Sequence, residues 1–65
     1  MVTLWFKPPS KSGIEYLKMV SAIKNSAHIS LRDAKDAVEI ERVTCEVKYK
    51  DAVIKAIEKA GGKLV

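Results

Sequence analysis

The most distinctive stretch of this 65-residue chain reads Ser30-Leu31-Arg32-Asp33-Ala34-Lys35-Asp36-Ala37-Val38-Glu39. Ser30 lies three residues before Asp33, which is a variant of the capping box that begins helices. The apolar positions of the stretch recur at helical spacing and predict a narrow seam against another element: Leu31, Ala34 and Val38. Oppositely charged side chains four residues apart predict two weak ion pairs: Arg32–Asp36 and Lys35–Glu39.

A strand and a second helix are predicted before this stretch. Val2, Leu4 and Phe6 alternate with other residues and predict a strand over 2–7, which Pro8-Pro9 ends because proline cannot donate a ladder hydrogen bond. Residues 14–26 then carry an apolar stripe with helical spacing, formed by Tyr16, Met19, Val20, Ile23 and Ala27. Leu17 and Val20 widen this stripe beside Lys24, so we expect either a helix packed on two sides or apolar side chains left partly exposed for a partner.

Another strand, a third helix and a closing strand are predicted after it. Residues 42–49 alternate strictly and predict one buried face, formed by Val43, Cys45, Val47 and Tyr49. Asp51 is the expected cap of the third helix, which ends where Gly61 fits a left-handed position, and residues 63–65 close the chain. The order β-α-α-β-α-β predicts an α+β fold of two layers, in which a three-stranded, mostly antiparallel sheet carries three helices on one face.

Length and composition restrict the class of protein. We expect one domain over residues 1–65 with a thin core, as a monomer or weak dimer. The formal net charge is +4, which permits weak attraction to nucleic acid or to an acidic protein. No apolar run approaches the ~20 residues of a membrane span, and the first residues lack a signal-peptide pattern. A single cysteine, Cys45, forms no internal disulfide, and this predicts a cytoplasmic location.

No residue pattern indicates an active site, so we expect no enzyme, no cofactor and no metal. Cys45 and His28 are single and far apart, whereas metal sites need several such ligands. We expect Cys45 to lie in the core and His28 to lie in a loop or cap. The three glycines, at positions 13, 61 and 62, do not make a phosphate-binding loop.

Nucleic-acid binding is an alternative function. Basic residues are expected to converge where the first two helices meet: Lys7, Lys11, Lys18, Lys24, Arg32 and Lys35. Trp5 and Tyr49 offer stacking surfaces if they lie on the open side of the sheet. No aromatic signature of a known RNA-binding module accompanies them.

The stretch from Ser30 to Glu39 resembles the C-terminal domain of the bacterial ribosomal stalk protein, the multicopy large-subunit protein that recruits translational GTPases. That family carries Leu-Lys-Glu-Ala-Lys-Asp-Leu-Val-Glu at this place, and the closing Ala56-Ile57-Glu58-Lys59-Ala60-Gly61-Gly62-Lys63-Leu64-Val65 is similar to its last helix, turn and strand. The likeness extends from Tyr16 onward. It implies a non-enzymatic docking domain with a protein partner, either a translation factor or another host protein.

In that family the docking surface lies on the first two helices. The matching positions here are Leu17, Val20, Lys24, Leu31, Arg32 and Lys35. The chain departs from the family pattern at Tyr16 and Ser21, where the family has lysines, and its inter-helix turn lacks glycine. No stretch matches the family's dimerisation domain and hinge, so we expect a free-standing relative, with a phage or another mobile element as one origin. The ClpS-type protease adaptor is similar in outline, but the loop at residues 7–11 lacks that family's Asn or Asp.

Overall fold

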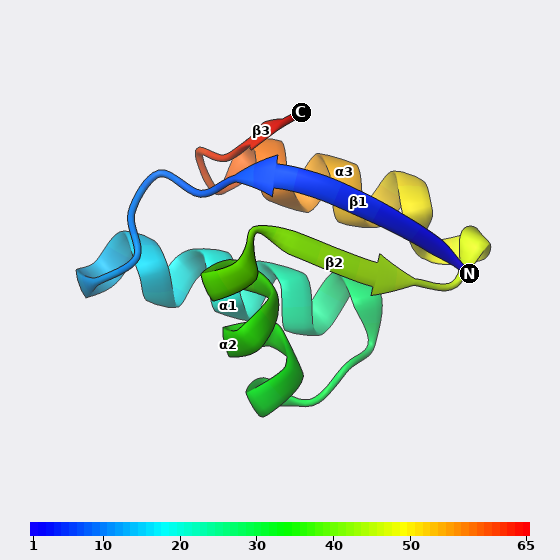
Figure 1. Cartoon of the computed structure of the whole chain (residues 1–65), viewed down its shortest axis with the longest axis horizontal. Coiled ribbons are helices and arrows are strands. Elements are labelled where there is room, and N and C mark those ends of the chain that lie inside the picture. Colours follow the sequence, from blue (N-terminus) through cyan, green and yellow to red (C-terminus); the bar gives the residue numbers. More distant parts are fainter.

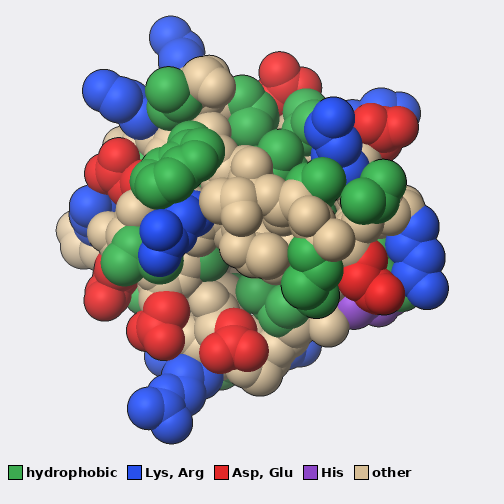
Figure 2. Space-filling view, turned by 45° about the vertical axis from the view of Figure 1, so that its right-hand side comes forward, with side chains coloured by type: hydrophobic (Ala, Val, Ile, Leu, Met, Phe, Trp, Pro, Cys, Tyr) green, Lys and Arg blue, Asp and Glu red, His purple; other side chains and the backbone are tan.

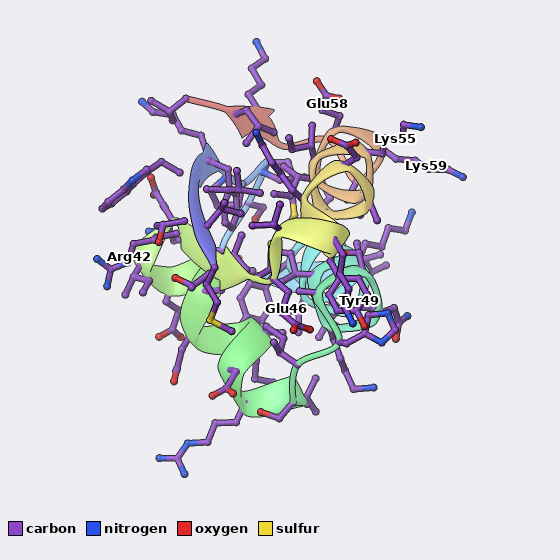
Figure 3. The ribbon with its side chains drawn as sticks, turned by 90° about the vertical axis from the view of Figure 1, so that its right-hand side faces the viewer. Arg42, Glu46, Tyr49, Lys55, Glu58 and Lys59 are labelled. Atoms are coloured by element: carbon purple, nitrogen blue, oxygen red, sulfur yellow. The ribbon has the colours of Figure 1, made fainter.

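A computed structural model describes all residues, 1–65, and confirms the α+β class. Two layers are present: α1 and α3 cover one face of the sheet, and α2 packs beside α1 and extends past the β2 edge (Figures 1 and 3). The elements follow one another as β1 (Val2–Lys7), α1 (Gly13–Ala27), α2 (Leu31–Ile40), β2 (Arg42–Cys45), the 3-10 helix η1 (Val47–Tyr49), α3 (Lys50–Lys59) and β3 (Lys63–Leu64).

The sheet is fully antiparallel, with strand order β2-β1-β3. Cross-strand pairing joins Val2 to Cys45 and Leu4 to Val43, and further along it joins Phe6 to Leu64. Because side chains alternate across a strand, these apolar pairs all face the helices. The residues between them face the other side of the sheet, which no helix covers (Figure 3).

Each layer contributes to one continuous core. Phe6 and Val43 enter it from the sheet, Met19 and Ile23 from α1, and Ile57 from α3. The predicted stripe of α1 is confirmed, since four of its five members are buried and Tyr16 packs against the core. Alanines on α2, at positions 34 and 37, are also buried, and their small side chains permit the close approach of α2 to its neighbours.

Three of the helix ends follow the predicted chemistry. The Ser30 hydroxyl accepts a hydrogen bond from the N–H of Asp33 at 3.1 Å, which confirms the cap of α2. His28 ends α1 in the left-handed conformation, with φ 57°, so its predicted role as a cap is confirmed. Gly61 follows α3 with φ 94°, a conformation that L side chains rarely adopt.

The strand predicted over 42–49 is too long, because the structure ends it at Cys45. The last pair of the ladder joins Val2 to Cys45, so the residues that follow have no strand opposite them. They form η1 instead, which leaves Val47 62% exposed although alternation predicted its burial. The prediction for Asp51 is also wrong in detail: α3 begins at Lys50, and Asp51 lies in its first turn rather than at its cap.

None of the helices combines the length and apolar character needed to cross a membrane.

Candidate functional site

The predicted docking residues lie on α1 and at the start of α2. Those with exposed side chains define what we call the helical surface: Leu17, Lys24, Leu31, Arg32 and Lys35. Leu17 is 58% exposed and Leu31 is 49% exposed. Large apolar side chains gain free energy when they leave water, so these two leucines offer apolar contacts to a partner, as do the other exposed apolar side chains of this small chain.

Val20 does not belong to this surface. Its side chain is only 1% exposed and is part of the core. Two alternatives were open for the wide apolar arc of α1: packing on two sides, or exposed apolar side chains. Val20 is packed, and Leu17 is exposed.

Helical geometry places the exposed residues of both helices on adjacent flanks. Met19 faces α3, because a Cβ added to Gly62 would come within 2.5 Å of Met19 Cε and within 2.9 Å of Ile57 Cγ2. At 100° per residue, Leu17 lies about 160° and Lys24 about 140° around α1 from Met19, which is the flank toward α2. On α2 the same geometry puts Leu31 and Lys35 together, on the flank opposite the one that faces β2.

The cations of the helical surface have no ion-pair partners. The structure contains two salt bridges, Lys11–Glu41 at 3.0 Å and Lys48–Glu46 at 4.0 Å. The two ion pairs predicted along α2 are therefore not formed, which agrees with the small gain that exposed pairs offer. Lys24, Arg32 and Lys35 are left free to meet an anion.

Two of the basic residues expected near the helix junction lie elsewhere. Lys7 is in β1, where it pairs across the sheet with Lys63. The Lys11 ammonium donates to the Glu39 carbonyl at 3.0 Å and pairs with Glu41, so it holds the end of α2 near the loop before α1. The six basic residues therefore do not all lie together, because Lys18, at about 100° from Met19 on the side away from Lys24, also lies on the other flank of α1.

A second candidate surface is the uncovered side of the sheet, which we call the open sheet face. Its residues come from all three strands: Thr3, Trp5, Lys7, Arg42, Thr44 and Lys63. Trp5 is 53% exposed, and the Arg42 guanidinium lies 5.2 Å from its ring centroid. The hydroxyl groups of Thr3 and Thr44 are hydrogen-bonded at 3.1 Å. This face carries three cationic side chains and no acidic side chain.

Tyr49 does not share the open sheet face with Trp5. It lies on the helix side of the molecule, while Arg42 projects from the opposite side (Figure 3). Its ring stacks on His28, with a centroid distance of 4.3 Å and an interplanar angle of 23°. The pair joins η1 to the end of α1, so Tyr49 is a packing residue and only Trp5 is available for stacking on a ligand.

A groove between α2 and β2 was not predicted from the sequence. It has a volume of about 280 Å³, and the space-filling view shows a hollow with acidic side chains near it (Figure 2). Eight residues line it: Ile29, Asp33, Asp36, Ala37, Ile40, Arg42, Val43 and Thr44. The available signal was the grouping of Asp33, Asp36 and Ile40 on one flank of α2, but locating the groove also required knowing that β2 is an edge strand.

The remaining reactive group is the Cys45 thiol, which is buried in the core as predicted. Loss of contact with water raises its pKa above the ordinary value of 9.0, and the positive charge of the N-terminus opposes this only in part. A protonated, buried thiol is a poor nucleophile. No group of three or more His, Cys, Asp or Glu side chains is placed to hold a metal ion.

Comparisons with known proteins return nothing for this chain: no family model, no curated protein and no solved structure matches it.

Proposed function

We propose that this protein is a small non-enzymatic docking domain that binds a protein partner through the helical surface. The observation that carries the proposal is the combination of two exposed leucines with three cations that lack ion-pair partners. Apolar side chains beside positive charges are complementary to a partner patch that is both apolar and acidic.

The resemblance to the ribosomal stalk domain supports the same surface, because that family docks through its first two helices. It also suggests a class of partner, a translational GTPase or another cytoplasmic host protein. A reduced, buried Cys45 is compatible with the cytoplasm.

The test is a titration of the isotope-labelled protein with purified translational GTPases, followed by the amide resonances of each residue. We expect Leu17, Lys24, Leu31 and Lys35 to shift together. Leu17→Asp should weaken binding by at least 10-fold, as expected for an apolar anchor worth more than about 1.4 kcal/mol.

The matched control for Leu17→Asp is Val47→Asp, because Val47 is an equally exposed apolar residue on η1. For the charges, Lys35→Glu is compared with Lys55→Glu, since Lys55 lies on α3, away from α2 (Figure 3). Equal effects of a surface variant and its control would contradict the assignment of the helical surface.

The open sheet face supports a second candidate function, the binding of single-stranded nucleic acid. An exposed tryptophan beside an arginine, on a face that also carries two lysines, matches the stacking and electrostatic requirements of such ligands. Trp5 is the single tryptophan of the chain, so its fluorescence reports on this face alone.

Oligonucleotide titration at low salt tests this candidate. Binding there should quench Trp5 fluorescence, and the affinity should fall steeply as salt rises. Arg42→Ala should weaken quenching, whereas Lys55→Ala on α3 should not. Unchanged fluorescence at low salt would eliminate nucleic acid as the ligand and leave the helical surface unaffected.

A further inference from the structure

The outer edge of β2 presents main-chain groups that no strand satisfies. β2 lies at the edge of the sheet, and the N–H of Phe6 donates to the Glu41 carbonyl at 3.1 Å. In an antiparallel ladder, alternate residues direct their N–H and C=O groups toward the neighbouring strand. Glu41, Val43 and Cys45 therefore face β1, while the main-chain groups of Arg42 and Thr44 point outward.

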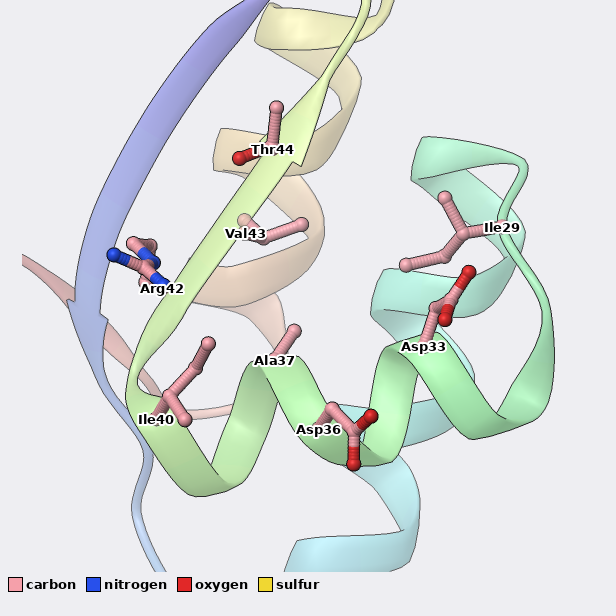
Figure 4. Close-up of a pocket in the computed structure, with 8 residues that line it drawn as sticks. All are labelled: Ile29, Asp33, Asp36, Ala37, Ile40, Arg42, Val43 and Thr44. Atoms are coloured by element: carbon pink, nitrogen blue, oxygen red, sulfur yellow. The ribbon is translucent and has the colours of Figure 1, made fainter.

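The groove lies along this unpaired edge. Figure 4 shows β2 on one side, α2 below, and Ile29 projecting from the α1–α2 connection on the other side. Its apolar lining includes Ile29, Ala37 and Ile40. A strand added to β2 would lie about 4.8 Å from it, on the side of β2 where the groove lies.

Two carboxylates make the groove acidic. Asp33 and Asp36 line it from α2, and neither takes part in a salt bridge. In a complete capping box the acid reaches back to the N–H of the cap residue. Here the Ser30 hydroxyl accepts the hydrogen bond from the Asp33 N–H, but the Asp33 carboxylate does not accept one from the Ser30 N–H. It is directed into the groove instead (Figure 4). The Arg42 guanidinium lies over Trp5, on the open sheet face.

We propose that the groove binds an extended basic segment of another polypeptide, which adds to β2 as a fourth strand. Main-chain hydrogen bonds to Arg42 and Thr44 hold the segment, as in other complexes formed by strand addition. Directly opposed residues of paired strands project to the same face of a sheet. A Lys or Arg opposite Val43 therefore places its aliphatic stem against Ile29 and Ile40 and its charge near Asp33 and Asp36.

A second copy of this chain is a poor occupant of the same edge. The β2 residues that project toward the helix side are apolar or acidic, namely Val43, Cys45 and the adjoining Glu41. Pairing of two β2 strands would supply no cation to the groove. It would also bring two α2 helices together through their acidic flanks, and like charges repel. Charge complementarity favours a basic partner.

The test uses a synthetic peptide, acetyl-Thr-Val-Thr-Lys-Thr-Val-Thr-amide, in which Lys and both Val project to one side of the strand. Titration to about 2 mM covers weak affinities in the millimolar range. We expect the amide resonances of Arg42 and Thr44 to shift and their hydrogen exchange to slow. Replacing the peptide lysine by Glu should abolish binding.

Paired variants separate the charge contribution from the main-chain contribution. Asp33→Asn with Asp36→Asn should weaken binding roughly 2- to 30-fold, the range for two exposed ion pairs. Asp51→Asn on α3 should leave it unchanged. N-methylation of the peptide threonines that flank Lys should abolish binding, because their N–H groups face β2, whereas N-methylation of Lys and Val should be tolerated.

Several outcomes would overturn the proposal. One is the absence of shifts at Arg42 and Thr44 at the highest peptide concentration, and another is equal affinity for the double Asp variant. Shifts confined to Leu17 and Lys35 would assign the peptide to the helical surface instead. Concentration-dependent shifts of Arg42 and Thr44 without peptide would identify a second copy as the occupant.

Discussion

Gly62 is the position at which a single methyl group should destabilise the fold most clearly. A Cβ built there lies 2.5 Å from Met19 Cε, 2.9 Å from Ile57 Cγ2 and 3.2 Å from the Ile57 carbonyl oxygen. Optimal carbon contacts are about 3.5–4.0 Å. The contact with Met19 Cε is therefore too short by roughly 1 Å, and the contact with Ile57 Cγ2 is too short by roughly half an ångström or more. The flexible end of Met19 has little room to move, because the side chain is fully buried in the core. Ile57 is β-branched and lies on a helix, so it cannot easily change its χ1 rotamer.

Overpacking of this kind typically costs about 1–3 kcal/mol. Ala in place of Gly also lowers the conformational entropy of the unfolded chain, and this stabilises the folded state by about 0.4–1 kcal/mol and offsets part of the cost. We therefore expect Gly62→Ala to lower the free energy of unfolding by about 1–2 kcal/mol. For a domain this small the total is on the order of 3–5 kcal/mol, so the loss is a large fraction of it.

Urea unfolding followed by far-UV circular dichroism measures this loss. With a slope of about 1 kcal/mol per molar urea, the midpoint should fall by roughly 1–2 M. Gly61→Ala is the comparison, because its Cβ would meet only Pro9 at 3.6 Å, while its φ of 94° makes Ala strained. Its cost should come from the backbone and not from the core.

A double-mutant cycle distinguishes the two causes. Met19→Val removes Cε, so the cost of Gly62→Ala should shrink in that background, and the cost of Gly61→Ala should stay the same. If Gly62→Ala costs less than about 0.5 kcal/mol, or costs the same with Val at position 19, the packing described around Gly62 is wrong.

Further predictions concern helix ends and the thiol. Ser30→Ala removes the hydrogen bond to the Asp33 N–H and should lower stability by about 1 kcal/mol, measured as a lower urea midpoint; an unchanged midpoint would argue against this cap. His28→Ala should cost more than loss of stacking on Tyr49 alone, because His adopts the left-handed conformation at φ 57° more readily than Ala does. His28→Gly should be milder, and thermal melts that reverse this order would contradict the left-handed cap. Burial raises the pKa of Cys45 from 9.0, so the unfolded chain loses its thiol proton first. The contribution of the protonated thiol to the free energy of unfolding should be complete below pH 9 and should fall as the pH rises through the pKa values of the unfolded and the folded chain. Urea unfolding at pH 7.5 and 9.5 should show this fall in the unsubstituted protein and less of it in Cys45→Ala.

Local patterns predicted those features of the secondary structure that depend on residue spacing within one helix. The stripe of α1 and the cap at Ser30 depend only on spacing within one element, and both are confirmed. The strand predicted over 42–49 failed because alternation cannot show where a partner strand ends. Its pattern continues through Val47, yet the ladder ends at the Val2–Cys45 pair.

The candidate surfaces were less predictable, because exposure depends on which neighbour approaches. Val20 and Leu17 lie on the same shoulder of α1 by spacing alone, but only Val20 is buried in the folded chain. The position of Trp5 on an open face depended on the absence of a second helical layer. The groove required the order of the strands, since residues far apart in the chain, such as Ile29 and Thr44, line it together.

Helix α2 separates two surfaces of opposite charge. Its Leu31 and Lys35 belong to the helical surface, and on its other flank Asp33 and Asp36 belong to the groove. A partner suited to one surface carries the wrong charge for the other, since the first attracts acidic groups and the second basic ones. The two ligands therefore have no reason to compete. Variants of Asp33 and Lys35 should act independently, although the two residues are neighbours on one helix.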